Sequence, residues 1–146
     1  MNTTTAQHSV SVAGVITDDD GRALLIRRRD TLHWQPPGGV LELDEAIEAG
    51  LRREVSEETG LTVEPVALTG VYKNMARGII ALVFRCKVVS GHLTVNDEVS
   101  GFQWATPEEV KAMADEAFAV RVLDALDALA GQSGPAVRHH DGVHIT

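Results

Sequence analysis

The chain contains two kinds of hydrophobic pattern, one typical of strands and one typical of helices. Runs rich in Val, Ile and Leu predict strands at residues 9–17, 23–26, 61–73, 78–89 and 98–104. Asp-Gly is typical of a tight turn, so the segment from Asp18 to Gly21 predicts a hairpin between the first two strands. We therefore interpret its aspartates as turn residues rather than as a metal site. The loop at residues 74–77 predicts a long hairpin between the third and fourth runs.

A helix with one apolar face is predicted between the second and third strands. It is expected to begin near Asp44 or Glu45 and to end at Gly60, because glycine is favoured just after a helix C-terminus. Glu45 would then lie in the first turn, where the helix dipole favours an anion. The apolar residues of this helix recur at intervals of four, at Ile47, Leu51 and Val55.

Two further helices are predicted toward the C-terminus. Thr106 is expected to cap the first, with Pro107 at the first helical position and Glu109 at the third. The second is expected over residues 117–130, with Gly131 ending it. Its inward-facing side chains are expected to be Val122, Leu123, Leu126 and Leu129.

The length of the chain fits one compact domain. With 146 residues, 44% of them hydrophobic, the chain can bury a core but has no room for two domains. We expect residues 1–8 to be flexible, residues 9–131 to form the domain and residues 132–146 to form a tail. Asp141 and Gly142 predict a turn followed by a short strand that pairs with a sheet edge, and a disordered tail is the alternative.

The tail also carries His139, His140 and His144, which raises the question of a metal site. Structural zinc takes four donors, and only Asp141 joins these histidines at ligand spacing. We therefore interpret them as residues without a metal.

The charge of the chain restricts its partners. A net charge of −8 argues against a protein that holds long nucleic acid, because that affinity comes mainly from Lys and Arg. A nucleotide ligand is therefore expected to be small. Cys86 is the only cysteine, so it forms no internal disulfide, and we interpret it as a core residue of a protein in a reducing compartment. With no signal peptide or membrane-spanning run, a cytoplasmic protein without membrane attachment is expected. A homodimer is left open.

Carboxylates gather on one face of the first predicted helix. Glu54, Glu57 and Glu58 stand at i, i+3 and i+4, so their side chains lie within one turn of each other. Like charges at this spacing repel, and a divalent cation would relieve the repulsion. Oxygen ligands without Cys or His favour Mg²⁺ or Mn²⁺ over zinc. A solvated helix face is the alternative for such a cluster taken alone.

The residues around the cluster resemble the Nudix box, G-x5-E-x7-R-E-U-x-E-E-x-G-U, in which U is aliphatic. Every fixed position of the pattern is met within residues 39–61. The matching residues are Gly39, Glu45, Arg53, Glu54, Val55, Glu57, Glu58, Gly60 and Leu61. The order of strands and helices extends the resemblance over most of residues 8–130. It implies an α/β fold of the Nudix type, with a mixed β-sheet sandwiched between helices.

The resemblance also implies roles for particular residues. Glu54, Glu57 and Glu58 would hold the metal ions together with the backbone carbonyl of Gly38, which matches the glycine preceding the box in a W-x-x-P-G-G approach. Gly39, Glu45 and Gly60 would support this arrangement. Arg53 lies four residues before Glu57, close enough for an ion pair that fixes the carboxylate, although an ordinary surface pair has the same spacing.

The identity of the general base is left open. In the resembling family it is either a box glutamate, here Glu54 or Glu57, or a glutamate from a later loop. Glu98, just before the strand that reaches Trp104, is the candidate for the second alternative, and a solvated charge at a strand edge has equal weight. Arg27 and Arg29 are expected on the same side of their strand and are the candidates to meet substrate phosphate.

The implied reaction is Mg²⁺-dependent hydrolysis of a nucleoside diphosphate linked to another group, X. Water would attack one phosphorus of a P–O–P bridge while the metal ions neutralise the phosphate oxygens. The box contacts only pyrophosphate and metals, so it does not distinguish an oxidised nucleoside triphosphate from ADP-ribose, another nucleotide sugar or a dinucleotide. The alternative is a catalytically silent nucleotide-sensing module, although such modules usually lose box carboxylates and are joined to a second domain. A purely structural protein would not explain the glycine and arginine spacing.

Overall fold

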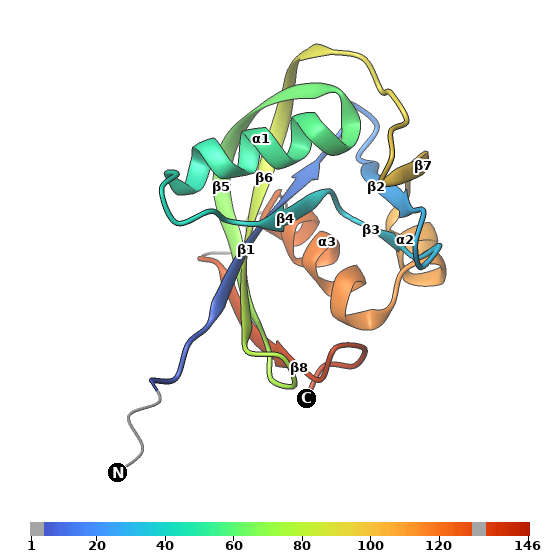
Figure 1. Cartoon of the computed structure of the whole chain (residues 1–146). Coiled ribbons are helices and arrows are strands. Elements are labelled where there is room, and N and C mark those ends of the chain that lie inside the picture. The colour runs from blue at the N-terminus through green and yellow to red at the C-terminus, as the bar shows by residue number, and fades with distance from the viewer. Residues whose placement is uncertain (1–4, 130–133) are drawn as a thin grey trace.

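The computed structural model describes residues 5–129 and 134–146. Its elements are β1 Ser9–Ile16, β2 Ala23–Arg28, β3 Trp34–Gln35, β4 Gly38–Val40, α1 Ile47–Thr59, β5 Leu61–Asn74, β6 Ile79–Gly91, β7 Val99–Ala105, α2 Pro107–Met113, α3 Glu116–Leu129 and β8 Ala136–His140. Figure 1 shows α1 crossing one face of the central strands, with α2 and α3 on the other side of the molecule. A mixed β-sheet between helices is thereby confirmed.

The main sheet has the strand order β4-β1-β6-β5-β8. In it β1 runs parallel to β6, β5 runs antiparallel to β6, and β8 runs parallel to β5. The predicted long hairpin between β5 and β6 is confirmed, with Leu61 opposite Gly91 and Asn74 opposite Ile79. β3, β2 and β7 form a separate antiparallel sheet.

The predicted hairpin between the first two strands is wrong. β1 and β2 belong to different sheets and share only the isolated bridge between Thr17 and Ala23. The turn itself forms as expected, because the Asp18 carboxylate accepts hydrogen bonds from the backbone N–H groups of Asp20 and Arg22. The chain turns at Asp18 but then leaves the plane of the first sheet.

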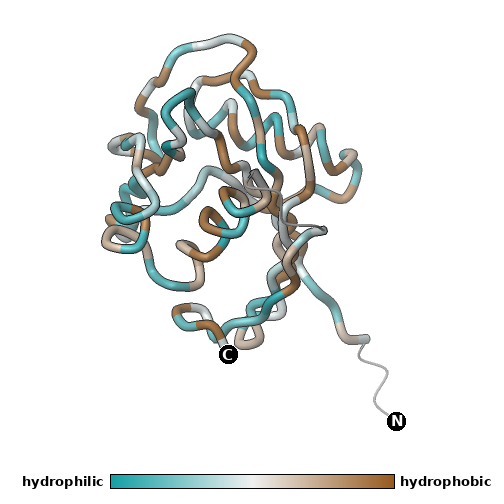
Figure 2. The backbone as a smooth tube through the Cα atoms, turned by 180° about the vertical axis from the view of Figure 1, so that it is seen from behind, coloured by the Kyte–Doolittle hydropathy of each residue, from teal (hydrophilic) through white to brown (hydrophobic). Residues whose placement is uncertain are grey.

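Two apolar layers pack on opposite faces of the main sheet. Alternate residues of a strand point to opposite faces, so Val12 of β1 packs with Leu51 and Val55 of α1, whereas its neighbour Ala13 packs on the α3 side with Val122. Figure 2 shows the corresponding recurrence of apolar positions between polar ones along the chain. Cys86 is buried in the layer under α1, as its apolar surroundings predicted.

α1 begins later than expected. Its N-cap is Ala46, so Glu45 precedes the helix instead of lying in its first turn. Ile47 is exposed, so of the predicted ridge only Leu51 and Val55 are buried. The predicted end is confirmed: Gly60 caps the helix in the left-handed conformation, with φ of 81°.

The predicted cap of α2 is confirmed. Thr106 accepts from the backbone N–H of Glu109, and the Glu109 side chain accepts from the backbone N–H of Thr106. In α3, Val122 is fully buried and Leu126 packs against the same cluster, whereas Leu123 is only partly buried. The predictions for the Leu129 side chain and for Gly131 lie outside what the structure describes.

The tail strand precedes the Asp141 turn rather than following it. β8 pairs with β5 through residues 136–140, and beyond the turn only Ile145 bridges back, to His140. Within the described ranges, no helix is long and apolar enough to cross a membrane.

Candidate active site

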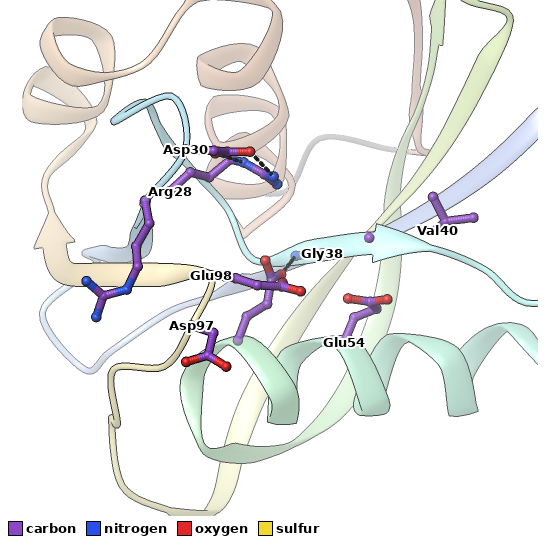
Figure 3. A pocket seen from close by; sticks show the side chains of 10 residues that line it. Arg28, Asp30, Gly38, Val40, Glu54, Asp97 and Glu98 are labelled. Atoms are coloured by element: carbon purple, nitrogen blue, oxygen red, sulfur yellow. Dashed lines mark hydrogen bonds and ion pairs between the residues drawn. The ribbon is translucent and has the colours of Figure 1, made fainter.

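A cavity of about 590 Å³ lies where α1, β4 and the segments after β2 and before β7 meet. In Figure 3, Glu54 rises from α1 toward β4, and Glu98 reaches the cavity from the segment before β7. The lining residues are Arg28, Arg29, Asp30, Gly38, Gly39, Val40, Glu54, Glu58, Asp97 and Glu98. Two of the three clustered box glutamates therefore share a cavity with Glu98.

Gly38 and Gly39 allow β4 to approach its neighbours closely. A Cβ atom at Gly38 would overlap the backbone carbonyl of Val12 on β1, and one at Gly39 would overlap the carboxylate of Glu54. The backbone N–H of Gly38 donates to Oε1 of Glu58 at 2.6 Å, which joins β4 to the last turn of α1. Packing against backbone therefore requires glycine at Gly38, whereas a side chain at Gly39 would displace the carboxylate of Glu54.

Arg53 holds the carboxylates of two box glutamates. Its guanidinium lies 2.7 Å from Glu45 Oε1 and 2.9 Å from Glu54 Oε1. The expected pair with Glu57 is present but longer, at 3.4 Å. The hydrogen bonds from Arg53 lower the pKa of Glu45 to about 2. Arg53 thus fixes Glu45 and Glu54 more closely than it fixes Glu57.

Glu58 is a buried carboxylate surrounded by like charge. Its residue surface is only 2% exposed. Burial, aided by the negative charges of Glu54 and Glu98, raises the pKa of Glu58 to about 7 despite the lowering effect of the hydrogen bond from the Gly38 N–H. Burial also raises the pKa of Glu54. Excess negative charge in a partly closed cavity is the environment that a hard cation stabilises.

The carboxylates of the cavity are of the ligand type that fits Mg²⁺ or Mn²⁺, although the described side chains do not converge on one point as metal ligands would. Glu54, Glu58 and Glu98 offer carboxylate oxygens, the ligand type that such ions prefer. In the part of the chain that the structure describes, no three His, Cys, Asp or Glu side chains converge as a metal cluster. The contact of Arg53 with Glu54 gives one reason, since it turns that carboxylate toward the guanidinium.

Glu57 lies outside the cavity lining. Its side chain is 59% exposed, although helical spacing places it on the same face of α1 as Glu54. A role for Glu57 in metal binding therefore requires its side chain to turn toward the cavity.

Asn96 positions Glu98, a role that was not predicted from the sequence. Its side-chain carbonyl accepts from the backbone N–H groups of Glu98 and Val99, and its side-chain N–H₂ donates to the carbonyl of Glu58 at 3.0 Å. This one amide connects the end of α1 to the segment that carries Glu98. The signal in the sequence was Asn followed by Asp-Glu just before a strand, which is typical of a side-chain-capped turn.

The three arginines at the end of β2 are arranged differently from the prediction. Arg28 and Arg29 line the cavity, whereas Arg27 is bound through Nε to the hydroxyl of Ser100 at 2.9 Å. β2 ends at Arg28, so strand alternation does not extend to Arg29. Arg28 pairs with Asp30 at 2.8 Å, and Arg29 donates to the backbone carbonyl of Asn96.

A comparison with models of known protein families shows which family the chain belongs to. The model of the NUDIX domain matches residues 7–126. The chain belongs to the Nudix family. A MutT-like protein of Streptomyces ambofaciens is 56% identical over 138 residues, covering 94% of this chain and 87% of that protein. As a Nudix member, the protein is a hydrolase of phosphorus-containing acid anhydrides.

Other relatives differ in the activities that their names give. An ADP-ribose pyrophosphatase of Methanocaldococcus jannaschii is 35% identical over 97 residues, covering 62% of this Nudix chain and 57% of its own length. The crystal structure of a UDP-X diphosphatase superposes with a TM-score of 0.82 at 20% identity, over 92% of this chain and 69% of that one. At 20% identity, the likeness to the UDP-X diphosphatase supports the fold alone.

The raised pKa of Glu58 predicts how the metal-free protein responds to pH. The folded-state pKa of about 7 exceeds the ordinary value of 4.5, so the unfolded chain loses this proton first as pH rises. The free energy of unfolding in EDTA should therefore fall between about pH 4.5 and about pH 7. Thermal denaturation across this range should show the fall, and Glu58→Gln should flatten it. An identical slope in the variant would contradict the assignment to Glu58.

Proposed function

We propose that the protein is a divalent-cation-dependent pyrophosphohydrolase that cleaves the P–O–P bridge of a nucleoside diphosphate linked to X. The observation that carries the proposal is the placement of Glu54, Glu58 and Glu98 around one cavity whose wall is formed by the Gly38-Gly39 backbone. The ADP-ribose pyrophosphatase among its relatives supports a small nucleotide substrate. Mg²⁺ is the favoured ion, with Mn²⁺ as the alternative.

Different residues of the chain have different roles in the proposed reaction. Glu54, Glu57 and Glu58, with the Gly38 carbonyl, are the proposed holders of Mg²⁺, which when bound would neutralise phosphate charge and acidify water. Glu98 is the proposed base that takes the proton of the attacking water. Arg29, beside the cavity, can contact a phosphate oxygen, whereas Arg28 is already paired with Asp30. Arg53 keeps Glu54 and Glu45 in position.

A substrate screen with a metal test checks this proposal. The protein should release product from at least one of a nucleoside triphosphate, ADP-ribose, a UDP-sugar and a dinucleoside polyphosphate when Mg²⁺ is present. EDTA should remove the turnover and excess Mg²⁺ should restore it. The rate should rise toward alkaline pH, because the attacking water then loses its proton more readily. Equal turnover of a good substrate in EDTA and in Mg²⁺ would overturn the mechanism.

A further inference from the structure

A second cavity, of about 440 Å³, adjoins the first. The two cavities share five lining residues, Arg28, Asp30, Gly38, Gly39 and Val40. The second cavity extends from there to α3 and β8, where Phe118, Arg121 and His140 line it. A substrate whose pyrophosphate lies beside Gly38 and Gly39 would place one of its end groups here.

Arg121 is a buried cation without a charge partner. Its surface is 9% exposed, and its Nε is buried with no hydrogen-bond partner. Among the described residues, no carboxylate lies within ion-pair distance of its guanidinium. It stacks on the rings of Phe118 at 4.8 Å and Tyr72 at 5.5 Å, contacts that attract a cation but accept no hydrogen bond in the plane of the guanidinium. Burial lowers the pKa of Arg121 to about 10.

His140 does not supply the missing acceptor. Its Nδ1 accepts from the backbone N–H of Gly142 at 3.0 Å. A neutral imidazole has one acceptor nitrogen and one N–H group, so the proton is on Nε2. That Nε2 faces Nη2 of Arg121 at 3.4 Å. The contact therefore joins two donors, and both lack an acceptor there.

The rest of the cavity has the same excess of positive charge. Three arginines, Arg28, Arg77 and Arg121, line it against the single acid Asp30. The carboxylate of Asp30 already accepts two hydrogen bonds from Arg28. This concentration of cations is found in a chain whose net charge is −8, so it is not a consequence of overall composition.

We propose that Arg121 and His140 bind a negatively charged group, a phosphate or a carboxylate, on the end of the substrate that occupies the second cavity. Unpaired buried donors carry a desolvation cost that an anionic ligand with several acceptor oxygens would offset. The inference rests on the proposed function and narrows it: the preferred substrates carry an anionic group in addition to the pyrophosphate. Arg121 is a substrate-binding residue in this proposal and takes no part in bond cleavage.

Binding of inorganic phosphate to the metal-free protein tests the proposed anion site at Arg121 and His140 independently of catalysis. In EDTA the box carboxylates repel anions, so saturable stabilisation by phosphate in thermal denaturation, with matching heat in calorimetry, should come from the cationic cavity. Arg121→Met should abolish it while melting at an equal or higher temperature, because an unpaired buried charge is removed. Arg121→Gln provides the same measurement if the Met variant fails to fold.

Arg85→Met is the matched control, since Arg85 also has a buried Nε without a partner but lines neither cavity. Unchanged phosphate stabilisation in both Arg121 variants would overturn the proposal.

Two substrate pairs test the specificity. UDP-glucose and UDP-glucuronate differ by a carboxylate on X, and ADP-ribose and its 2′-phosphate differ by a phosphate on the nucleoside. In at least one pair the charged member should have a KM about 10- to 100-fold lower, and Arg121→Met should remove this preference, whereas Arg85→Met should keep it. Equal KM values within both pairs would overturn the inference while leaving hydrolysis itself intact. Absence of Mg²⁺-dependent hydrolysis for every substrate would instead overturn the proposed function, and the phosphate measurement would still stand.

Discussion

Glu58→Gln is expected to lower kcat/KM by at least about 10²-fold in a protein that stays folded. Loss of a residue that only supports a metal ligand costs about 10- to 100-fold, so loss of a ligand should cost no less. Gln keeps the size of the side chain and can still accept from the Gly38 N–H. The variant also removes a buried charge beside Glu54 and Glu98, so its melting temperature in EDTA should equal or exceed that of the wild type above pH 7.

Two further variants show whether the loss of kcat/KM is specific to glutamates on the proposed metal-binding face of α1. Glu57→Gln should also lose activity, although Glu57 is exposed, because the proposed function turns its carboxylate toward the cavity. Glu48→Gln makes the same chemical change on an exposed residue of the first turn of α1 and should leave kcat/KM unchanged. Near wild-type kcat for Glu58→Gln under saturating Mg²⁺ would show that Glu58 is not a metal ligand.

The parts of the site that the sequence predicted depend on local geometry. Glu54 and Glu58 lie at adjacent cavity positions because helical periodicity fixes residues four apart on one face. Gly60 ends α1 because glycine adopts the left-handed conformation at low cost. Both features depend on neighbours within a few residues, and these are visible in one sequence.

The parts that were missed depend on contacts between distant segments. The turn at Asp18 was correct, but the pairing of β1 with β6 and of β2 with β7 is set by packing against residues far along the chain. The position of Glu45 has a local cause instead, because outside the helix its carboxylate accepts hydrogen bonds from Arg53 and from the backbone N–H of Glu42.

Long-range contacts also explain why the second cavity was absent from the prediction. Arg121 and His140 are separated by 19 positions and meet only because β8 pairs with β5 beside α3. His140, one of the tail histidines interpreted as residues without a metal, is a buried neighbour of Arg121. Sequence spacing carries no signal for such a pair.

Glu98→Gln is expected to lower kcat by about 10²–10⁴-fold with little change in KM, as is typical of losing a general base. The position supports this role: Glu98 lines the cavity with Glu54 and Glu58, and Asn96 holds its backbone N–H at 2.9 Å. Asp97→Asn provides a comparison, because Asp97 is the adjacent carboxylate in the same lining, and it should cause a much smaller loss.

The dependence of the Glu98→Gln rate on Mg²⁺ separates a base from a residue that supports the metal. If Glu98 is the base, the low kcat should persist at saturating Mg²⁺. If Glu98 only supports the metal ions, the apparent affinity for Mg²⁺ should fall and excess metal should restore the rate. Wild-type kcat, KM and metal dependence in this variant would remove Glu98 from the mechanism. The base would then be a box glutamate, and Glu54 would be tested first because it lines the cavity and Glu57 does not.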